Sequence, residues 1–171
     1  DKPLARLWMH CEVVMADGKK VSRAAGNDLT LERLTERGFD GPTVRYWLLA
    51  THYRKVLHYS LRELQRAAQC VARLNEFAAR LAHCQPGRRA LDLDQALFAA
   101  HAAWQDAMDN DLNVPKALGT LFAFIRHVNR LLNRGELDAD QVRQVLDFMR
   151  QANGVLNVID FQREAPDARA A

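Results

Sequence analysis

The feature that most constrains this chain is the recurrence of apolar residues every three or four positions over most of its length. This spacing places apolar side chains on one face of an α-helix, and that face must pack against other helices. The pattern runs through residues 61–81, 97–107, 118–132 and 142–149. The sequence therefore predicts an antiparallel helical bundle with short connections.

The ends of the bundle helices are indicated by local signals. Ser60 is followed by Glu63, and Asp138 by Gln141. In such a capping box each side chain satisfies a backbone N–H of the other residue, so we expect helices to begin at both places. The pair 153–154, Asn-Gly, is expected to end the last helix. The polar, alanine-rich stretch 162–171 is expected to be a flexible tail.

The first 58 residues predict a different organisation. Residues 7–15 are rich in strand formers and end at the turn dipeptide Asp17-Gly18, which predicts one strand. A polar loop over 19–27 precedes a short helix capped by Asp28 or Thr30, and a further helix enters at Asp40. The predicted fold class is therefore mainly α, with a small β-containing unit followed by an antiparallel helical bundle.

Charge is distributed unevenly along the chain. Residues 1–91 hold 16 Lys and Arg against 9 Asp and Glu, whereas residues 92–171 hold 8 against 12. An anionic partner would prefer the first half. Arg62, Arg66, Arg73 and Arg80 contribute to this excess, although on charge alone they are better explained as the solvated face of one helix.

The three cysteines limit the chemistry of the chain. Cys11, Cys70 and Cys84 form no CxxC pair and are too few for a disulfide framework, which favours a reducing, cytoplasmic environment. Their spacing to histidines does not predict a zinc site. No apolar run approaches the roughly 18–20 residues that a membrane span requires. The chain opens on Asp1 rather than Met, so we expect a piece of a longer protein.

One loop has the composition of a phosphate-binding segment. Residues 18–27 place three cations and a hydroxyl within five positions, bracketed by Gly18 and Gly26. Such groups can surround a polyphosphate and neutralise charge as it develops. Taken alone, a loop of this kind is more often a solvated turn.

The residues of this loop and three further segments resemble a known family. Lys20-Val21-Ser22-Arg23-Ala24, followed by Gly26-Asn27, is similar to the KMSKS signature of class I aminoacyl-tRNA synthetases. Residues 8–10, 44–54 and 107–117 resemble, in order and spacing, the cysteinyl-tRNA synthetase patterns WMH, VRYFLLSxHYR and AMDDDFNTPxA. The resemblance covers residues 7–160, and the last two patterns are specific to that family.

The resemblance implies ATP-dependent activation of cysteine and its transfer to tRNA(Cys). Lys20 and Arg23 occupy the two lysine positions of the signature, where they would contact the phosphates of ATP with its Mg ion, and Ser22 lies between them. Residues 1–58 would form the KMSKS-like loop and stem-contact fold, and residues 59–161 a tRNA-docking helical bundle. The candidates for contacts with tRNA phosphates are Arg54, Lys55, Arg62 and Arg66.

The resemblance also implies what this segment lacks. In the family, the HIGH motif and the cysteine-selecting zinc site would lie before Asp1, so no residue of this chain is expected to bind metal. The isolated chain is accordingly expected to be catalytically inactive. The resemblance further implies a monomer that acts in the cytoplasm.

Three departures from the family pattern leave alternatives open. Arg23 replaces a lysine, Ala24 replaces a serine, and Glu12 stands where the family usually has glycine. Arginine keeps the charge but presents a planar fork in place of a compact ammonium. One alternative is a cysteine ligase paralogue that acts on a small-molecule amine. The other is a catalytically degenerate helical module that binds tRNA or another partner.

Overall fold

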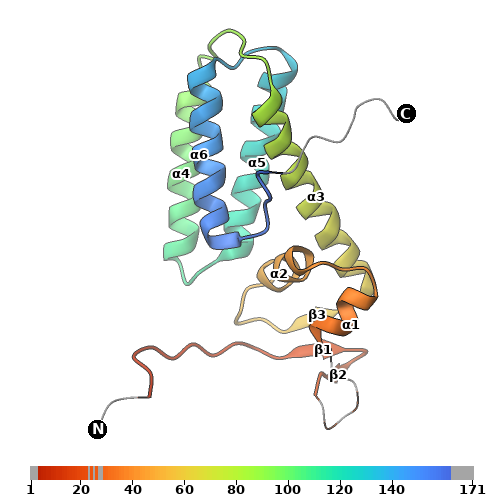
Figure 1. Ribbon diagram of the computed structural model, residues 1–171. Coiled ribbons are helices and arrows are strands. Elements are labelled where there is room, and N and C mark those ends of the chain that lie inside the picture. The colour runs from red at the N-terminus through yellow and green to blue at the C-terminus, as the bar shows by residue number, and fades with distance from the viewer. Residues whose placement is uncertain (1–3, 23, 25, 27–28, 163–171) are drawn as a thin grey trace.

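The computed structural model describes residues 4–22, 24, 26 and 29–162. In this part of the chain a small unit of strands and short helices lies at one end of a long helical bundle (Figure 1). The architecture is mainly α with a small sheet, as predicted. The elements are β1 (Val14–Ala16), β2 (Lys19–Lys20), α1 (Leu31–Glu36), α2 (Gly41–Leu49), β3 (Leu57–Tyr59), α3 (Leu61–His83), α4 (Leu93–Asp109), α5 (Val114–Asn133) and α6 (Ala139–Leu156).

The sheet has the strand order β2-β1-β3, with β1 antiparallel to β2 and parallel to β3. The turn between β1 and β2 holds Asp17 and Gly18 at φ of 50° and 74°. Two successive left-handed residues are what a tight hairpin turn requires, and Asp-Gly supplies them at low cost. The predicted turn is confirmed.

The prediction of one strand over residues 7–15 is wrong in extent and in number. Only Val14–Ala16 is a strand in this region, and Leu7 and Trp8 are 90% and 67% exposed. An extended segment becomes a strand only where a neighbour pairs with it, and β3 pairs with residues 14–16 alone. Strands of two or three residues, such as β2 and β3, are too short to show a periodic pattern.

The two short helices begin where the sequence predicts. The Thr30 hydroxyl accepts a hydrogen bond from the backbone N–H of Arg33, and the Asp40 carboxylate accepts one from Thr43. Gly38, at φ of 87°, follows α1 and reverses the chain. Buried Tyr46 and Trp47 then pack α2 toward α3. The Asp28 alternative for the first cap lies outside the described residues.

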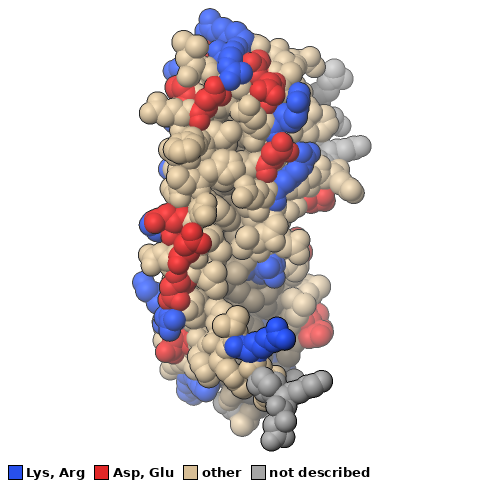
Figure 2. All heavy atoms as spheres, turned by 90° about the vertical axis from the view of Figure 1, so that its left-hand side faces the viewer, with Lys and Arg blue, Asp and Glu red and all other residues tan. Residues whose placement is uncertain are grey.

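The face of the bundle on the α4 side carries acidic and basic side chains interspersed, without a large field of one sign (Figure 2). Such a surface suits contact with water rather than with a polyanion. Among the helices of the described residues, none combines the length and the apolar character needed to cross a bilayer.

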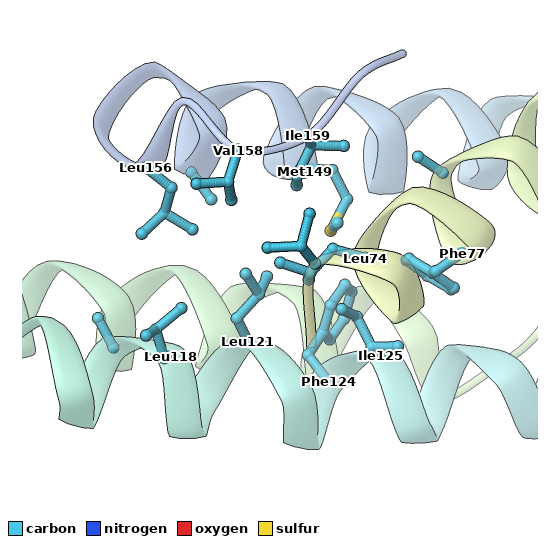
Figure 3. Close-up of a cluster of buried hydrophobic side chains, with 14 of the residues drawn as sticks. Leu74, Phe77, Leu118, Leu121, Phe124, Ile125, Met149, Leu156, Val158 and Ile159 are labelled. Carbon is cyan, nitrogen blue, oxygen red and sulfur yellow. The ribbon is translucent and has the colours of Figure 1, made fainter. Parts of the chain in front are cut away.

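The part of the bundle core drawn in Figure 3 is formed by apolar side chains from α3, α5, α6 and the segment after α6, and α4 adds buried residues such as Leu93 and Trp104 to the same core. Leu74, Leu121 and Met149 meet there and are fully buried. Phe148 of α6 contacts Phe124 of α5 edge-to-face, with ring centroids 5.3 Å apart. Burial of each such side chain stabilises the fold by roughly 1.5–3 kcal/mol, so this core holds the helices together.

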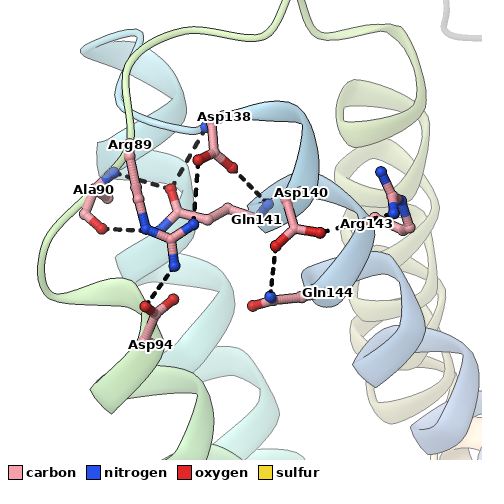
Figure 4. A network of polar contacts seen from close by, with 8 residues as sticks. All are labelled: Arg89, Ala90, Asp94, Asp138, Asp140, Gln141, Arg143 and Gln144. Carbon is pink, nitrogen blue, oxygen red and sulfur yellow. Dashed lines mark hydrogen bonds and ion pairs between the residues drawn. The ribbon is translucent and has the colours of Figure 1, made fainter.

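At the far end of the bundle the α3–α4 and α5–α6 connections meet in a polar network (Figure 4). The buried Gln141 side chain accepts a hydrogen bond from the Ala90 N–H at 2.9 Å and donates one to the Ala90 carbonyl at 2.8 Å. Arg89 bridges the Asp94 and Asp138 carboxylates. The capping box at Asp138 and Gln141 is confirmed with both of its hydrogen bonds.

Two other helix ends differ from their predictions. The Ser60 hydroxyl accepts from the Glu63 N–H, but the Glu63 carboxylate pairs with Arg66 at 2.6 Å, so only half of that capping box forms. The last helix continues through Asn153 to Leu156. It does so because the Asn153 amide accepts hydrogen bonds from the backbone N–H groups of the segment that follows. The predicted tail over 162–171 lies, apart from Gln162, outside the described residues.

Candidate functional site

Lys20, the first cation of the KMSKS-like segment, lies on the edge strand β2. Its Cα pairs with that of Met15, and Lys19 pairs with Ala16. Because successive side chains of a strand point to opposite faces, Lys19 and Lys20 are directed to different sides of the sheet. The loop predicted from residue 18 therefore begins as a strand, and the sheet orients Lys20.

The remaining residues of the segment follow directly from β2. The Val21 N–H donates a hydrogen bond to the Val14 carbonyl at 2.9 Å, which keeps the chain beside β1. Ser22 is half-buried, and Ala24 and Gly26 are exposed. Arg23, the second predicted phosphate contact, lies outside the described residues.

Strand β3 connects this segment to the bundle. It pairs with β1 along the edge opposite β2 and leads through the N-cap Ser60 into α3. Lys55 lies just before β3, and Arg62 and Arg66 lie in the first two turns of α3. Three of the four candidate tRNA contacts thus flank the same small sheet that carries Lys20. No ion pair of Lys55 or Arg62 occurs among the described residues.

Arg54, the fourth candidate, has a different environment. Its Nε lies 2.6 Å from Asp111 Oδ2, and its Nη2 lies 3.1 Å from Asp111 Oδ1. The guanidinium also lies over the Tyr53 ring, 5.0 Å from its centroid. A bidentate pair of this kind balances the arginine charge. The same contact links the α2–β3 connection, which holds Arg54, to the α4–α5 turn, which holds Asp111.

Asp111 is the centre of this cluster, which joins segments 57 residues apart in sequence. The Tyr53 hydroxyl also donates a hydrogen bond to its carboxylate, and the His52 Nε2 lies 3.8 Å away. Hydrogen bonds from Arg54 and then from Tyr53 lower the pKa of Asp111 to about 2. The acceptor carboxylate in turn raises the pKa of Tyr53. The cluster therefore requires an ionised Asp111.

The sequence did not indicate this cluster. Helix α2 ends at Leu49, so Tyr53 lies in the connection after it, and Asp111 lies in the turn between α4 and α5. Asp111 and Leu112 have φ of 57° and 51°, which turns the chain sharply before α5. Residues 44–54 and 107–117, which contain the side chains of this cluster, carry the two family-specific patterns. That shared resemblance is the feature of the sequence that could have linked the two segments.

The Asp111 cluster predicts a pH dependence of stability. The carboxylate pKa is lowered from 3.8 to about 2, so its stabilising effect is complete above pH 3.8 and is lost as the pH falls through 2. We expect Asp111→Asn to lower the unfolding midpoint at pH 6, and this deficit to shrink as the pH approaches 2. Thermal unfolding from pH 2 to 6 measures it. Asp109→Asn, two residues away, should unfold like the wild type; an equal deficit there would contradict the role of Asp111.

The potential metal ligands in the described part of the chain do not converge on a common point. Within the described ranges, no three His, Cys, Asp or Glu side chains gather closely enough to hold a metal ion. Cys11 is exposed and Cys84 is half-buried, and burial raises the pKa of the Cys84 thiol.

Comparison with known proteins supports the resemblance in two ways. Residues 1–69 match the family of class I (C) tRNA synthetase catalytic domains, and residues 103–160 match the DALR domain. The chain is also 35% identical over 170 residues to the cysteine–tRNA ligase of Chlamydia felis, covering 97% of this chain and 36% of that protein.

Further relatives carry the same name. The cysteine–tRNA ligase of Chlamydia caviae is 36% identical over 97% of this chain and 36% of its own length. That of Solibacter usitatus is 31% identical over 92% of this chain and 34% of its own length. The chain thus spans about a third of the length of the curated relatives it matches. Its sequence patterns, mainly helical fold and both domain matches agree, and on these grounds the chain belongs to the cysteinyl-tRNA synthetase family.

Proposed function

We propose that this chain is the part of a cysteine–tRNA ligase that supplies an ATP-phosphate loop and a tRNA-docking surface. Residues 1–58 form the loop-bearing stem-contact unit, and residues 59–161 form the docking bundle. The observation that carries the proposal is the placement of Lys20 on a sheet that continues directly into the arginine-bearing helix α3. One continuous segment can then bring ATP phosphates and the tRNA into a defined relation.

The chemistry proposed for the loop is electrostatic. Adenylate formation expels pyrophosphate, so negative charge accumulates on the leaving phosphates. The Lys20 ammonium and the Arg23 guanidinium are donors of the right charge, and Ser22 offers a hydroxyl between them. Magnesium would accompany ATP as part of the substrate. The zinc that the family implies is not assigned to any residue of this chain.

The proposed RNA partner is tRNA(Cys), bound by a monomer in the cytoplasm. Lys55 and Arg62 are its foremost phosphate contacts, because no carboxylate of the described residues pairs with them. Arg66 remains a candidate, since its exposed pair with Glu63 contributes less than about 1 kcal/mol and exchanges readily for a phosphate. Arg54 is a weaker candidate because Asp111 already balances its charge.

The two alternatives lack support from a specific observation. A ligase for a small-molecule amine needs no docking bundle, yet residues 103–160 match a DALR domain. A degenerate module is suggested only by Glu12, Arg23 and Ala24. The relatives named above are cysteine–tRNA ligases throughout.

Salt dependence tests the docking surface. The 171-residue chain should bind a tRNA(Cys) transcript with a dissociation constant that rises steeply between 50 and 300 mM KCl. The contacts of Lys55, Arg62 and Arg66 alone give a log–log slope of magnitude at least about 2 to 3, because each releases roughly one counterion. Fluorescence anisotropy with labelled tRNA measures the slope. Absence of binding, or binding that salt does not weaken, would count against tRNA docking.

The catalytic part of the proposal makes a separate prediction. The 171-residue chain alone should show no cysteine-dependent ATP–pyrophosphate exchange above the buffer blank, because the residues described here include only the phosphate side of an active site. Exchange of radiolabelled pyrophosphate into ATP is the measurement. ATP–pyrophosphate exchange by the chain alone that Lys20→Ala abolishes would overturn the proposal that this chain supplies only the phosphate side of an active site.

A further inference from the structure

The arginines for which the structure describes a partner differ in the kind of group they contact. Most of those with a described partner pair with a carboxylate. These are Arg54, Arg66, Arg88, Arg89, Arg134, Arg143 and Arg150. Within the described residues, Arg73 and Arg80 of α3 and Arg126 of α5 make no such pair, and these three line one groove. A groove in which no paired carboxylate balances the charge of these arginines is a candidate anion site.

The groove lies between α3 and α5 and encloses a cavity of about 80 Å³. Arg73 and Arg80 are seven residues apart on α3, so they lie on the same face about 10 Å apart along the helix axis. Arg126 faces them from α5, and Glu76 is the one carboxylate in the lining. Three guanidiniums against one carboxylate leave the groove with a net positive charge.

Neutral partners hold two of these arginines in place. Arg80 donates hydrogen bonds to the side-chain oxygens of Asn129 at 2.6 Å and Asn133 at 2.9 Å, both on α5. The Arg73 guanidinium lies over the Phe122 ring, 5.2 Å from its centroid. Amides and an aromatic face orient a guanidinium without cancelling its charge, so the remaining N–H donors stay available to an anion.

The shape of the surface favours a nucleic acid backbone over an acidic protein. Arg62, Arg66, Arg73 and Arg80 follow one face of α3, and the 18 helical steps from the first to the last cover about 27 Å. Such a line of cations matches a chain of phosphates. The apolar groups in the groove lining, Phe77 and Ile125, are only 2% and 4% exposed. A protein partner would need exposed apolar anchors, which this groove does not offer.

We propose that the α3–α5 groove, formed by Arg73, Arg80 and Arg126, binds backbone phosphates of RNA and extends the tRNA-docking surface from the small sheet along the bundle. This inference rests on the proposed tRNA-docking function. It replaces the interpretation of Arg73 and Arg80 as a merely solvated helix face. The groove recognises charge and spacing rather than base sequence, because guanidiniums on phosphates carry no sequence information directly.

The test compares groove variants with a matched pair on α6. Arg73→Gln/Arg80→Gln removes two arginines, seven residues apart, whose partners among the described residues are neutral, and Arg143→Gln/Arg150→Gln removes two carboxylate-paired arginines with the same spacing. The groove variant should bind labelled tRNA(Cys) about tenfold or more weakly at 100 mM KCl. Its salt slope should fall in magnitude by about 1.5 to 2. The control should bind within twofold of the wild type.

A second variant keeps every arginine. Asn129→Asp places a carboxylate beside Arg80 and should weaken tRNA binding about threefold to tenfold, since it neutralises the guanidinium. Gln151→Glu adds the same charge on α6 and should not weaken binding more than twofold. Circular dichroism of each variant confirms that the helices form before binding is compared.

The outcomes separate this inference from the proposed function. If the wild-type chain does not bind tRNA(Cys), the docking proposal itself fails. If it binds, but the groove variants match their α6 controls, only the groove assignment is overturned. Equally tight, equally groove-dependent binding of heparin or of an acidic polypeptide would overturn the assignment to RNA.

Discussion

Lys20→Ala, in the full-length ligase that carries this segment, is expected to slow cysteine-dependent ATP–pyrophosphate exchange about 100-fold to 1000-fold. Removal of one preorganised donor to a developing negative charge has an effect of this size. In the proposed site the sheet would supply the preorganisation, because the pairing of Lys20 with Met15 fixes the backbone from which the side chain projects. Steady-state exchange rates over a range of ATP concentrations measure the loss.

Lys19→Ala is the matched comparison for this prediction. It removes the same charge from the same strand, but from the opposite face of the sheet. We expect its exchange rate to stay within about threefold of the wild type. Equal losses in the two variants would show a long-range effect of net charge, and an unchanged Lys20→Ala rate would remove this lysine from the phosphate site.

The second large effect concerns stability and the far end of the bundle. Gly87→Ala is expected to lower the free energy of unfolding by about 3 kcal/mol and the melting temperature by about 10 °C. The backbones of the two connections touch there. The Gly87 N–H donates to the Leu137 carbonyl at 2.6 Å, and the Arg88 N–H donates to the Gly135 carbonyl at 3.1 Å. A methyl group on Gly87 would overlap the Gly135 carbonyl oxygen, so one connection must move.

Gly119→Ala tests whether this effect is local. Gly119 lies within α5, and a methyl group there would meet no atom within 4 Å. Alanine favours a helix interior over glycine, so this variant should equal or exceed the wild type in stability, by up to about 1 kcal/mol. Denaturant and thermal unfolding of the purified chain compare the two. A Gly87→Ala protein as stable as Gly119→Ala would mean that the two connections do not meet.

The cause of the Gly87 effect extends beyond one contact. Movement of the α3–α4 connection would also disturb the pairing of Gln141 with the Ala90 backbone, which is buried. Buried polar groups that lose their partners are costly, because water cannot replace the lost hydrogen bonds. The two losses share one cause, so a single glycine controls how the bundle closes at this end.

The sequence alone predicted the helices and most of their starts correctly. The apolar spacing of α3 and α5, the caps Thr30, Asp40 and Asp138, and the Asp17-Gly18 turn depend on residues within one or two turns of each other, so local physics decides them. The same locality explains the failures. The short strands β2 and β3 form because β1 lies between them, and α6 continues past Asn153 because the next segment folds back onto that side chain.

The candidate site shows the same difference between features set by local sequence and features set by the fold. The motif residues could be named from sequence, because their order and spacing along the chain carry the resemblance. The sequence could not show which of the cations have a carboxylate partner that balances their charge. Arg54 is paired with Asp111 and Arg80 with two asparagines, in each case across about 50 residues of chain. By itself the sequence determined helix periodicity, caps and family. Only the tertiary structure decided the partners of Arg54 and Arg80, because those partners meet through folding rather than through spacing along a helix.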